Sequence, residues 1–447
     1  MSTTIGGVRI ADMPDLGAFN DSSSVVGERA GSGRFSAPQL RSYITAGLPW
    51  VNVRDWGAKG DGLTDDTAAF NAALASIAGV GGNGKLIIPA GNYKITGPLT
   101  YPSGYLHVEG AGPGSVLSLF NPTSDLFTFA GTNITLSDFR VLTPYQTSTH
   151  GGLFNFLNAS NIRLDKVSTD GGFGVVQFLG APGALTYRTN ITNCHFVNVM
   201  NNAVFYDPYF GGLGMISDTE MLAAPNNTGG NGIIIEAGDT FTFTNINIQG
   251  FPEGIEVVSK TGGINYAANL FAANVLCDGG GNPAPNLMDG WIFNGSMAGT
   301  YVARIHLSGC WAGAMGRHGF YVLNASDVTF SNCIGIANGG HGFLVVTPCS
   351  DITLDGCTAM ANSAGAANVN DGIHIAGPVT DFIITGCRSK PDASYGGGPA
   401  QRYGVFIDGS ANNRYIVTGN NLNGNVTAGL ADTSAGSPTR FVSQNII

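Results

Sequence analysis

Charged residues are scarce in this chain of 447 residues, where they make up 11% of the sequence. Acidic residues outnumber basic ones, so the formal net charge is -10 at pH 7, and no cluster of lysine and arginine occurs. A nucleic-acid surface needs such a cluster to neutralise phosphates. The composition therefore excludes nucleic acid as a partner. It suits a neutral glycan, whereas an acidic glycan would require local basic groups, and these are sparse.

Long apolar runs are also missing. No stretch of 18 or more apolar residues occurs, which argues against insertion into a membrane. The first residues lack a basic region followed by an apolar stretch, so we expect no secretory signal peptide. The chain contains only seven cysteines, an odd number, and none lies in a nucleophile motif, so we expect no catalytic cysteine.

Glycine, in contrast, is abundant, with 67 residues, and a short phrase repeats along the chain. Each copy is an alternating apolar run, then a polar turn, then a small residue at a fixed point. The clear copies have this point at Cys194, Cys310, Cys333, Cys357, Cys387 and Asn420, and weaker copies have it at Asp138, Lys166, Thr219, Asn245 and Asn274. Intervals of 23 to 36 residues between strand-like segments predict a stacked solenoid. Most cysteines recur at the fixed point, which predicts a buried stack of thiols and no disulfides.

Two parts of the chain differ in character. Residues 1–48 contain two short segments and a small helix expected from about Pro38 to Ala46, which is too little chain for a core of its own. Residues 49–447 hold the repeats. They begin with a strand, a glycine-rich turn and a helix capped by Thr64 or Asp65. We expect this helix to cover the open edge of the first coil.

The start of the second part resembles a known family. Residues 53–70, with Gly-Ala-Lys-Gly-Asp-Gly-Leu-Thr-Asp-Asp at their centre, and Ile88-Pro-Ala-Gly-Asn-Tyr93 are similar to the opening motif of the pectate-lyase-like right-handed parallel β-helix superfamily. That superfamily includes polygalacturonases and many bacteriophage tailspikes. The resemblance implies an all-β, right-handed, single-stranded parallel β-helix with an N-terminal capping helix. It implies much less about chemistry, because the fold carries hydrolases, lyases and spikes without enzymatic activity.

The leader carries a second resemblance. Residues 1–48 are similar to the short particle-attachment segments that precede the β-helix in phage and prophage tailspikes. This implies a phage tail or baseplate protein as a partner. It also implies a place in the virion tail, for a protein made in the host cytoplasm.

Each predicted coil has a second strand that usually starts at a glycine. Alternation places the first and third residues after this glycine in the core and the middle residue outside. The outward residues form a row that is mostly apolar: Val176, Phe205, Ile234, Glu256, Ile292, Tyr321, Leu344, His374 and Phe406. A continuous apolar surface typically marks an interface, which predicts a homotrimer of parallel helices. The alternative is that the chain's own loops cover this row.

The residue before the glycine forms a polar row: Asn202, Asn231, Glu253, Asp289, His318, His341, Asp371 and Tyr403. Hydrolysis of a glycan needs one carboxyl group as an acid and another as a base or nucleophile. Glu253 and Asp289 lie one coil apart, so we predict them as this pair, with His318, His341 and Asp371 extending the catalytic site. An alternative is that these residue types merely occupy turns.

Further residues complete the predicted site. We expect Arg317 and Tyr403 to bind substrate and Trp311 to stack on a sugar ring, whereas Trp291 is phased toward the core. Asp207 and Glu236 share one phase on adjacent coils and form an alternative acid pair. His318, His341 and Asp371 would also suit a metal, but nothing in the sequence demands a metal or a cofactor, and we predict neither.

The sequence thus predicts a phage tailspike that binds and depolymerises a bacterial capsular, exo- or lipopolysaccharide as a glycoside hydrolase. Gly340-His341-Gly342 resembles a histidine motif of polygalacturonases, but the paired aspartates expected one coil earlier are missing, so we do not predict that activity. The rival interpretations are a polysaccharide lyase on the same scaffold and a receptor-binding spike without enzymatic activity.

Overall fold

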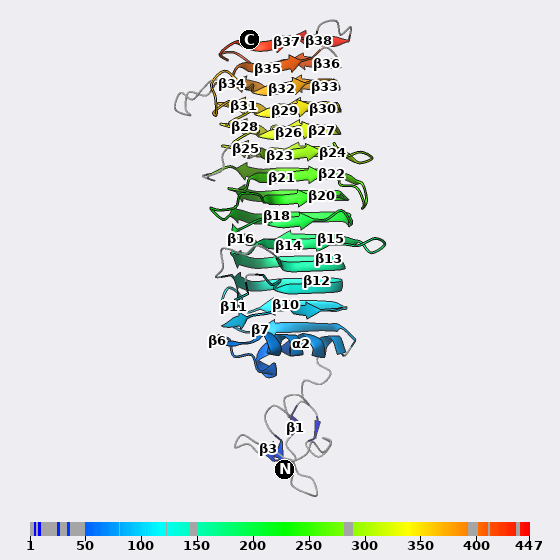
Figure 1. Cartoon of the computed structure of the whole chain (residues 1–447), viewed down its shortest axis with the longest axis vertical. Helices are drawn as coiled ribbons and strands as arrows, with labels where there is room; N and C mark the ends of the chain where they lie inside the picture. The colour runs from blue at the N-terminus through cyan, green and yellow to red at the C-terminus, as the bar shows by residue number, and fades with distance from the viewer. Residues whose placement is uncertain are drawn as a thin grey trace.

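The computed structural model describes residues 50–447 except 80, 103, 122, 144–150, 281–288, 392–400, 410–411 and 435–438. Before residue 50 it describes only two antiparallel strand pairs, β1 (Thr4–Ile5) with β2 (Val8–Arg9) and β3 (Val25–Val26) with β4 (Arg34–Phe35). The helix expected from about Pro38 to Ala46 lies outside the described residues. From residue 50 onward the chain winds into a column of stacked coils (Figure 1).

Each coil contributes one strand to each of three parallel sheets, and the strands pair only with those of neighbouring coils. We name these sheets 1, 2 and 3 in the order in which a coil visits them. Sheet 1 contains β9 (Leu99–Tyr101), the beginnings of β12 (Phe127–Leu142) and β13 (Gly152–Asp170), β14 (Gly174–Leu179), β17 (Val204–Tyr206), β19 (Asn231–Ile235), β21 (Glu253–Val258), β23 (Asp289–Asn294), β26 (Phe320–Leu323), β29 (Phe343–Val346), β32 (Ile373–Ala376), β35 (Tyr403–Asp408) and β37 (Ala428–Asp432).

Sheets 2 and 3 complete the column. Sheet 2 contains β5 (Trp50–Asn52), β7 (Asn83–Ile88), β10 (Tyr105–Gly110), the middles of β12 and β13, β15 (Thr186–Thr192), the beginnings of β18 (Phe210–Ala223), β20 (Gly238–Gln249) and β22 (Tyr266–Asp278), β24 (Tyr301–Ser308), β27 (Ala325–Ser331), β30 (Cys349–Asp355), β33 (Val379–Thr385), β36 (Asn413–Thr418) and β38 (Arg440–Ser443). Sheet 3 contains β6 (Asp61–Asp65), β8 (Gly91–Ile95), β11 (Ser115–Leu119), the ends of the long strands, β16 (His195–Val199), β25 (Trp311–Gly313), β28 (Ile334–Ile336), β31 (Thr358–Met360) and β34 (Arg388–Lys390). The predicted right-handed parallel β-helix is confirmed, with about 13 turns.

The repeated phrase of the sequence is the corner between sheets 2 and 3. One residue per coil adopts the left-handed conformation there, which glycine and asparagine tolerate best. In the clear copies it directly precedes the cysteine or asparagine of the repeat, as at Asn193, Gly309, Asn332, Gly356, Gly386 and Gly419, with φ from 52° to 69°. In four weaker copies the left-handed residue is itself the residue that we predicted as the fixed point. The true equivalent of the cysteine is then the next residue in the chain, so the prediction is one residue too early at Asp138, Lys166, Asn245 and Asn274.

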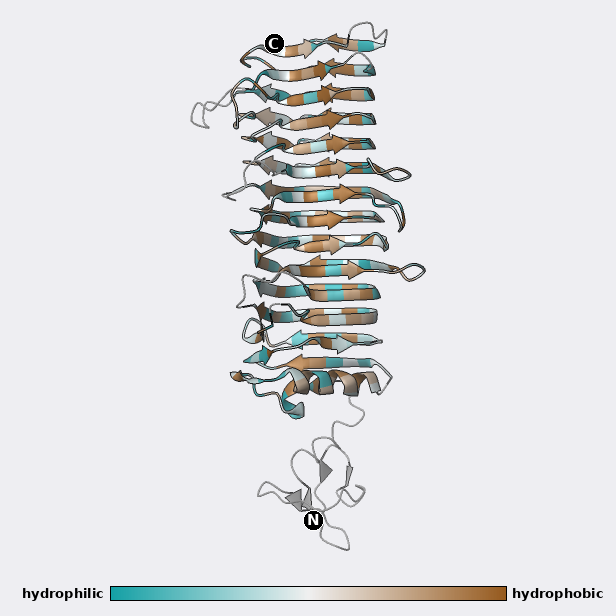
Figure 2. Ribbon diagram, viewed as in Figure 1, coloured by the Kyte–Doolittle hydropathy of each residue, from teal (hydrophilic) through white to brown (hydrophobic). Residues whose placement is uncertain are grey.

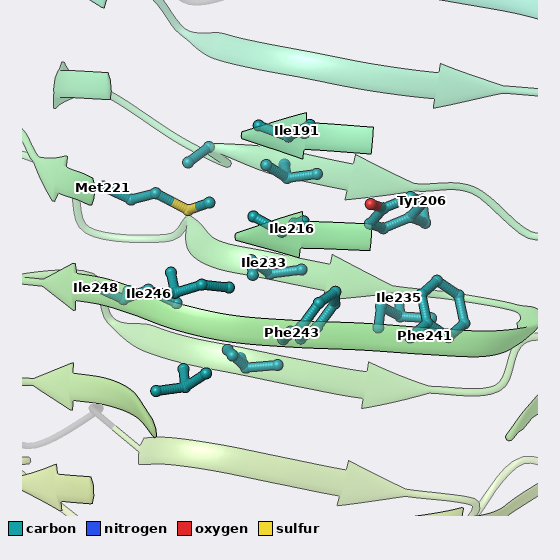
Figure 3. Packing of buried hydrophobic residues seen from close by; sticks show 14 of the residues in the cluster. Ile191, Tyr206, Ile216, Met221, Ile233, Ile235, Phe241, Phe243, Ile246 and Ile248 are labelled. Carbon is teal, nitrogen blue, oxygen red and sulfur yellow. The ribbon is translucent and has the colours of Figure 1, made fainter. Parts of the chain in front are cut away.

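The core fills the inside of the column with apolar side chains from all three sheets. Isoleucine and phenylalanine residues of successive coils lie above one another, as Figure 3 shows for Ile191, Ile216 and Phe243. Aromatic rings also stack between coils, and the centroids of Phe320 and Phe343 are 4.6 Å apart. Hydrophobic residues recur along the strands from one end of the column to the other (Figure 2). Trp291 is fully buried in this core, as predicted.

The predicted thiol stack is present. All seven cysteines are free and buried, and five of them follow the corner between sheets 2 and 3. Four thiols, those of Cys310, Cys333, Cys357 and Cys387, donate to backbone carbonyls of the previous coil; for example, Cys357 Sγ lies 3.3 Å from the oxygen of Phe330. Asn420 continues the row with an amide that donates to the carbonyl of Ile384. Burial raises the pKa of Cys194 to about 12, which suits a packing role.

Helix α2 (Thr67–Gly79) lies across the N-terminal end of the column (Figure 1). It buries Phe70, Leu74 and Ile77, and Asp65 accepts a hydrogen bond from the backbone N–H of Thr67 at its start. A short 3-10 turn, η2 (Val53–Trp56), precedes it. Among the described residues, no helix has both the length and the apolarity to span a membrane.

The corner conformation generates a stability prediction. Gly386 has φ 63°, and a Cβ atom there would make only ordinary van der Waals contacts, the nearest at 3.6 Å, so the left-handed backbone is the main limit on substitution. Gly386→Val should lower stability by about 1–2 kcal/mol, because a β-branched residue pays the full cost of that conformation. Gly386→Asn should be nearly neutral, since Asn332 occupies the same corner two coils earlier. Differential scanning calorimetry of the two variants would test this, and equal losses would contradict it.

Candidate active-site face on sheet 1

The outward row of sheet 1 has the predicted phase over most of its length. Backbone pairing connects, in order, Phe205, Ile234, Glu256, Ile292, Tyr321, Leu344, His374 and Phe406. The prediction is wrong at Val176, which is fully buried and pairs with Val204 of the core. Gln177 takes the outward position, because Val175, and not Gly174, aligns with Ala203 of the next coil.

This outward row is only partly exposed. Ile234 and Ile292 are buried, and none of the row ranks among the large apolar side chains with high exposure. The exposed large apolar side chains gather instead on sheet 2, at Met215, Phe271, Ile383, Ile416 and Phe441. The predicted homotrimer is untested, and the row on which it was predicted is not the most exposed apolar surface.

The polar row before the glycines forms a hydrogen-bonded ladder between coils. In most coils the side chain accepts a hydrogen bond from the backbone N–H of the next residue in the row. His318 Nδ1 accepts from His341 (3.1 Å), and His341 Nδ1 accepts from Asp371 (2.8 Å). Asn202 and Asp289 accept in the same way from the next coil. The polar row therefore holds the corner between sheets 3 and 1 in place.

The ladder fixes the protonation of two histidines. A ring nitrogen that accepts a hydrogen bond carries no proton, so His318 and His341 are protonated on Nε2 alone. Burial lowers the pKa of His318 to about 4, with a further contribution from the charge of Arg317. Burial also lowers the pKa of His341 to about 2, helped by His374 and His318. Both rings are neutral hydrogen-bond donors at neutral pH, and neither is a ready general acid.

His341, Asp371 and His374 bring possible metal ligands within 4.8 Å of one another. The donor set does not suit a metal well, because the Nδ1 lone pair of His341 is already occupied by the backbone N–H of Asp371. Its Nε2 then carries the proton and lies 3.4 Å from His374 Nδ1. The arrangement favours hydrogen bonding between the rings over metal ligation.

Both aspartates of the row are fully buried and each is held by an arginine. Asp289 binds Arg317 through one oxygen and accepts from the backbone N–H of His318 (2.8 Å) through the other. Asp371 receives two hydrogen bonds from Arg402, at 3.0 and 2.9 Å. Glu253 and Asp289 do pair in register, as predicted, but the carboxylate of Asp289 is turned into these contacts and away from solvent. Direct contact of Asp289 or Asp371 with substrate is therefore not supported.

Glu253 instead shares its surroundings with Glu256, three residues along β21. The side-chain amide of Asn231 donates to Glu253 (3.1 Å) and to Glu256 (2.9 Å). Burial, the charge of Glu256 and a hydrogen bond between the two carboxyl groups raise the pKa of Glu253 to about 7. This close pair was missed from the sequence, because Glu256 was assigned to the outward apolar row.

The alternative acid pair lies at the other end of the same strands. Asp207 accepts hydrogen bonds from the backbone N–H groups of Gly180 (2.6 Å) and Tyr209 (2.9 Å), and burial raises its pKa. Glu236 forms an ion pair with Lys260, yet burial and the charges of Asp207 and Glu256 raise its pKa. Both carboxyl groups are buried and already bonded, so they suit a supporting role beside the Glu253 and Glu256 pair.

The predicted substrate-binding residues separate in space. Tyr403 belongs to the polar row, and its ring lies 5.0 Å from that of Phe406. Arg317 is partly exposed but is committed to Asp289. Trp311 lies at the start of β25 on sheet 3, on a different face, and its indole folds over Gly313. The expectation that Trp311 joins this site is wrong, because a coil turns a corner between Trp311 and His318.

Sequence comparison places the chain in a family. The profile described as rhamnogalacturonase A/epimerase, pectate lyase-like, matches residues 50–281, more than half of the chain. The chain belongs to this pectate lyase-like family. A second profile, right-handed beta helix region, matches residues 225–388. The resemblance seen in the opening motif is thereby confirmed.

Individual relatives of this pectate lyase-like chain match it over short stretches or in fold alone. Mannuronan C5-epimerase AlgE2 of Azotobacter vinelandii is 42% identical over 72 residues, which cover 15% of this chain and only 7% of that protein. The AlgE4 A-module of the same organism has a TM-score of 0.58 at 18% identity over 88% of this chain and 100% of its own. The tailspike of E. coli bacteriophage HK620 has a TM-score of 0.56 at 12% identity, covering 95% of this chain and 82% of its own. These structural likenesses show the fold.

The raised pKa of Glu253 generates a prediction about stability. A carboxyl group whose pKa is higher in the folded state stabilises the fold fully below its ordinary pKa of 4.5, and this contribution is lost as pH rises through about 7. The melting temperature of the wild type should therefore fall between about pH 5 and pH 8 relative to that of Glu253→Gln. Asp327→Asn, an exposed carboxyl on sheet 2, serves as the control. A constant difference across this range would show that Glu253 ionises normally.

Proposed function

We propose that this protein is a glycoside hydrolase that cleaves a bacterial surface polysaccharide on sheet 1. The proposal rests on the Glu253 and Glu256 pair, in which burial and a neighbouring charge keep Glu253 protonated near neutral pH. Catalysis of this kind needs a carboxylic acid that still holds its proton at the working pH and a second, ionised carboxylate. The pair supplies both on one partly exposed strand.

The roles of the two carboxyl groups follow from the raised pKa of Glu253. Glu253 donates its proton to the glycosidic oxygen, and Glu256 acts as the second carboxyl group. One amide nitrogen of Asn231 donates to both carboxyl groups. The two groups are therefore closer than the about 6.5–9.5 Å by which an inverting enzyme makes room for a water molecule. This favours a retaining mechanism. Asn231 orients the pair, and the charge of Arg317 limits how far the pKa of Glu253 rises.

We further propose that the protein acts as a tailspike of a phage or prophage. It would work in the virion tail, with residues 1–48 attaching it to a tail or baseplate protein. The fold likeness to the HK620 tailspike and the leader resemblance support this. The bound partner would be a capsular, exo- or lipopolysaccharide of the host.

A polysaccharide lyase or epimerase is the second candidate. The local identity to mannuronan C5-epimerases favours it. These enzymes abstract a proton beside a uronate carboxylate, so the products distinguish the candidates: a lyase gives unsaturated uronates that absorb ultraviolet light, whereas a hydrolase gives new reducing ends alone. A spike without enzymatic activity would give neither.

Substitution of the pair tests the hydrolase. Glu253→Gln should lower the rate of reducing-end release from a cleaved capsular polysaccharide by about 10²–10⁴-fold, because it removes the proton donor. The wild-type rate should fall as pH rises through about 7, where Glu253 loses its proton. Glu256→Gln should also lose activity, whereas Asp327→Asn should retain it. Full activity of Glu253→Gln in a correctly folded protein would overturn the assignment.

The oligomeric state tests the tailspike. A tailspike of parallel β-helices should have a solution mass three times the 46.1 kDa of one chain. Light scattering coupled to size exclusion measures this directly. A mass of one chain would contradict the homotrimer but would leave the hydrolase untouched.

A further inference from the structure

Sheet 1 presents three rows of side chains along the outer surface of the column. These rows contain acidic residues but no basic residues other than histidine. The polar row runs from Asn202 to Tyr403. The outward row runs from Phe205 to Phe406 and continues toward the N-terminus through Gln177, Asn155, Thr128 and Thr100. A third row at the strand ends holds Leu179, Asp207, Glu236, Val258, Asn294, Leu323, Val346, Ala376 and Asp408. None of these rows contains a lysine or an arginine.

Three cations reach this face among the described residues, and each is bonded to a buried carboxylate. Lys260 pairs with Glu236, Arg317 with Asp289, and Arg402 with Asp371. The sequence segments 281–288 and 392–400 contain no lysine or arginine either. The part of this face that the structure describes therefore offers no unpaired cation for an anionic ligand.

The remaining carboxyl groups leave the face negative. Among the described residues, Asp207, Glu256 and Asp408 pair with no lysine or arginine; Asp408 is half-exposed and lies 3.9 Å from Nε2 of His374, a ring whose pKa is lowered by burial. The nearby imidazoles do not offset this charge, because the hydrogen-bonded ladder keeps His318 and His341 neutral.

Between these charges the face is apolar and aromatic. Ile292, Tyr321 and Leu344 separate the Glu253 and Glu256 pair from the cluster around His374, with one residue per coil at about 4.8 Å spacing. At the far side the ring of Phe406 lies 4.9 Å from that of His374 and also packs on Tyr403. Such surfaces bind the apolar faces of sugar rings.

We propose that the substrate of this face is a neutral polysaccharide and that polyuronates are excluded by charge. The inference rests on the proposed hydrolase and specifies its substrate class. A polyuronate carries one negative charge per sugar, so it would meet repulsion from the unpaired carboxylates without gaining a single free cation in return. A neutral glycan lies on the apolar strip between the charged ends and meets no such repulsion. The inference also disfavours a lyase or epimerase, since both require a uronate.

Separated pools of substrate test this class. Surface polysaccharides from a panel of bacterial strains are divided by anion exchange into a neutral and an acidic pool, and wild-type protein is incubated with each. New reducing ends from the neutral pool, lost in Glu253→Gln, are expected. Reducing ends from the acidic pool alone, without ultraviolet-absorbing unsaturated uronates, would overturn the neutral class while leaving the hydrolase intact; with such uronates they would overturn both. Release from neither pool would overturn the hydrolase and the substrate class together.

A charge swap tests the repulsion itself. Asp408→Lys places an unpaired cation on sheet 1, and Asp327→Lys makes the same change of net charge on sheet 2. In affinity electrophoresis through alginate at low salt, wild type should not be retarded. Asp408→Lys should bind alginate at least about fivefold more tightly than Asp327→Lys, the change that one pair of unit charges at contact supports. Retardation of the wild type, or equal binding by both variants, would overturn the exclusion of polyuronates.

Discussion

The hydrogen bonds between neighbouring coils are the constraint on which the rest of this structure depends. Parallel pairing in register holds equivalent residues of successive coils about 4.8 Å apart, so each sequence position becomes a row on the surface or in the core. The inward rows make the apolar core, and the thiols of Cys333 and Cys357 cap carbonyls of the coil before them. The outward rows gather chemistry from residues that lie far apart in the chain. Glu253 and Asn231, for example, are 22 residues apart and bond directly.

Much of this architecture could be predicted because the repeat has a local cause. A left-handed residue is needed at the corner between sheets 2 and 3, and this need appears in the sequence as asparagine or glycine before cysteine. The capping helix was predictable from its apolar face and its acidic start. The phase failed at Val176, because Val175 and not Gly174 aligns with Ala203 of the next coil, and the sequence does not show this offset of one residue.

The sequence could predict which site residues lie in neighbouring coils, but it could not predict which side chains contact one another. Adjacency of Glu253 and Asp289 follows from the period, but the direction of each side chain depends on the partners nearby. Asp289 turns to Arg317 and to the backbone of His318, whereas Glu253 turns along its own strand to Glu256. Two carboxyl groups three residues apart on a strand do not signal contact in a sequence, because alternation places them on opposite sides of an ideal strand. Their meeting is visible in the structure, where the amide of Asn231 from the preceding coil bonds both groups.

The ladder of the polar row has a consequence for how such a surface changes over evolution. The backbone N–H of each coil requires an acceptor from the coil before it, and asparagine, aspartate and histidine all satisfy that requirement, as Asn202, Asp289 and His318 show. Each of these three residue types can accept this hydrogen bond at the same position of a coil. A coil can therefore exchange an amide, a carboxylate or an imidazole without losing its anchor, so the chemistry of this surface can change while the backbone of the column stays in place.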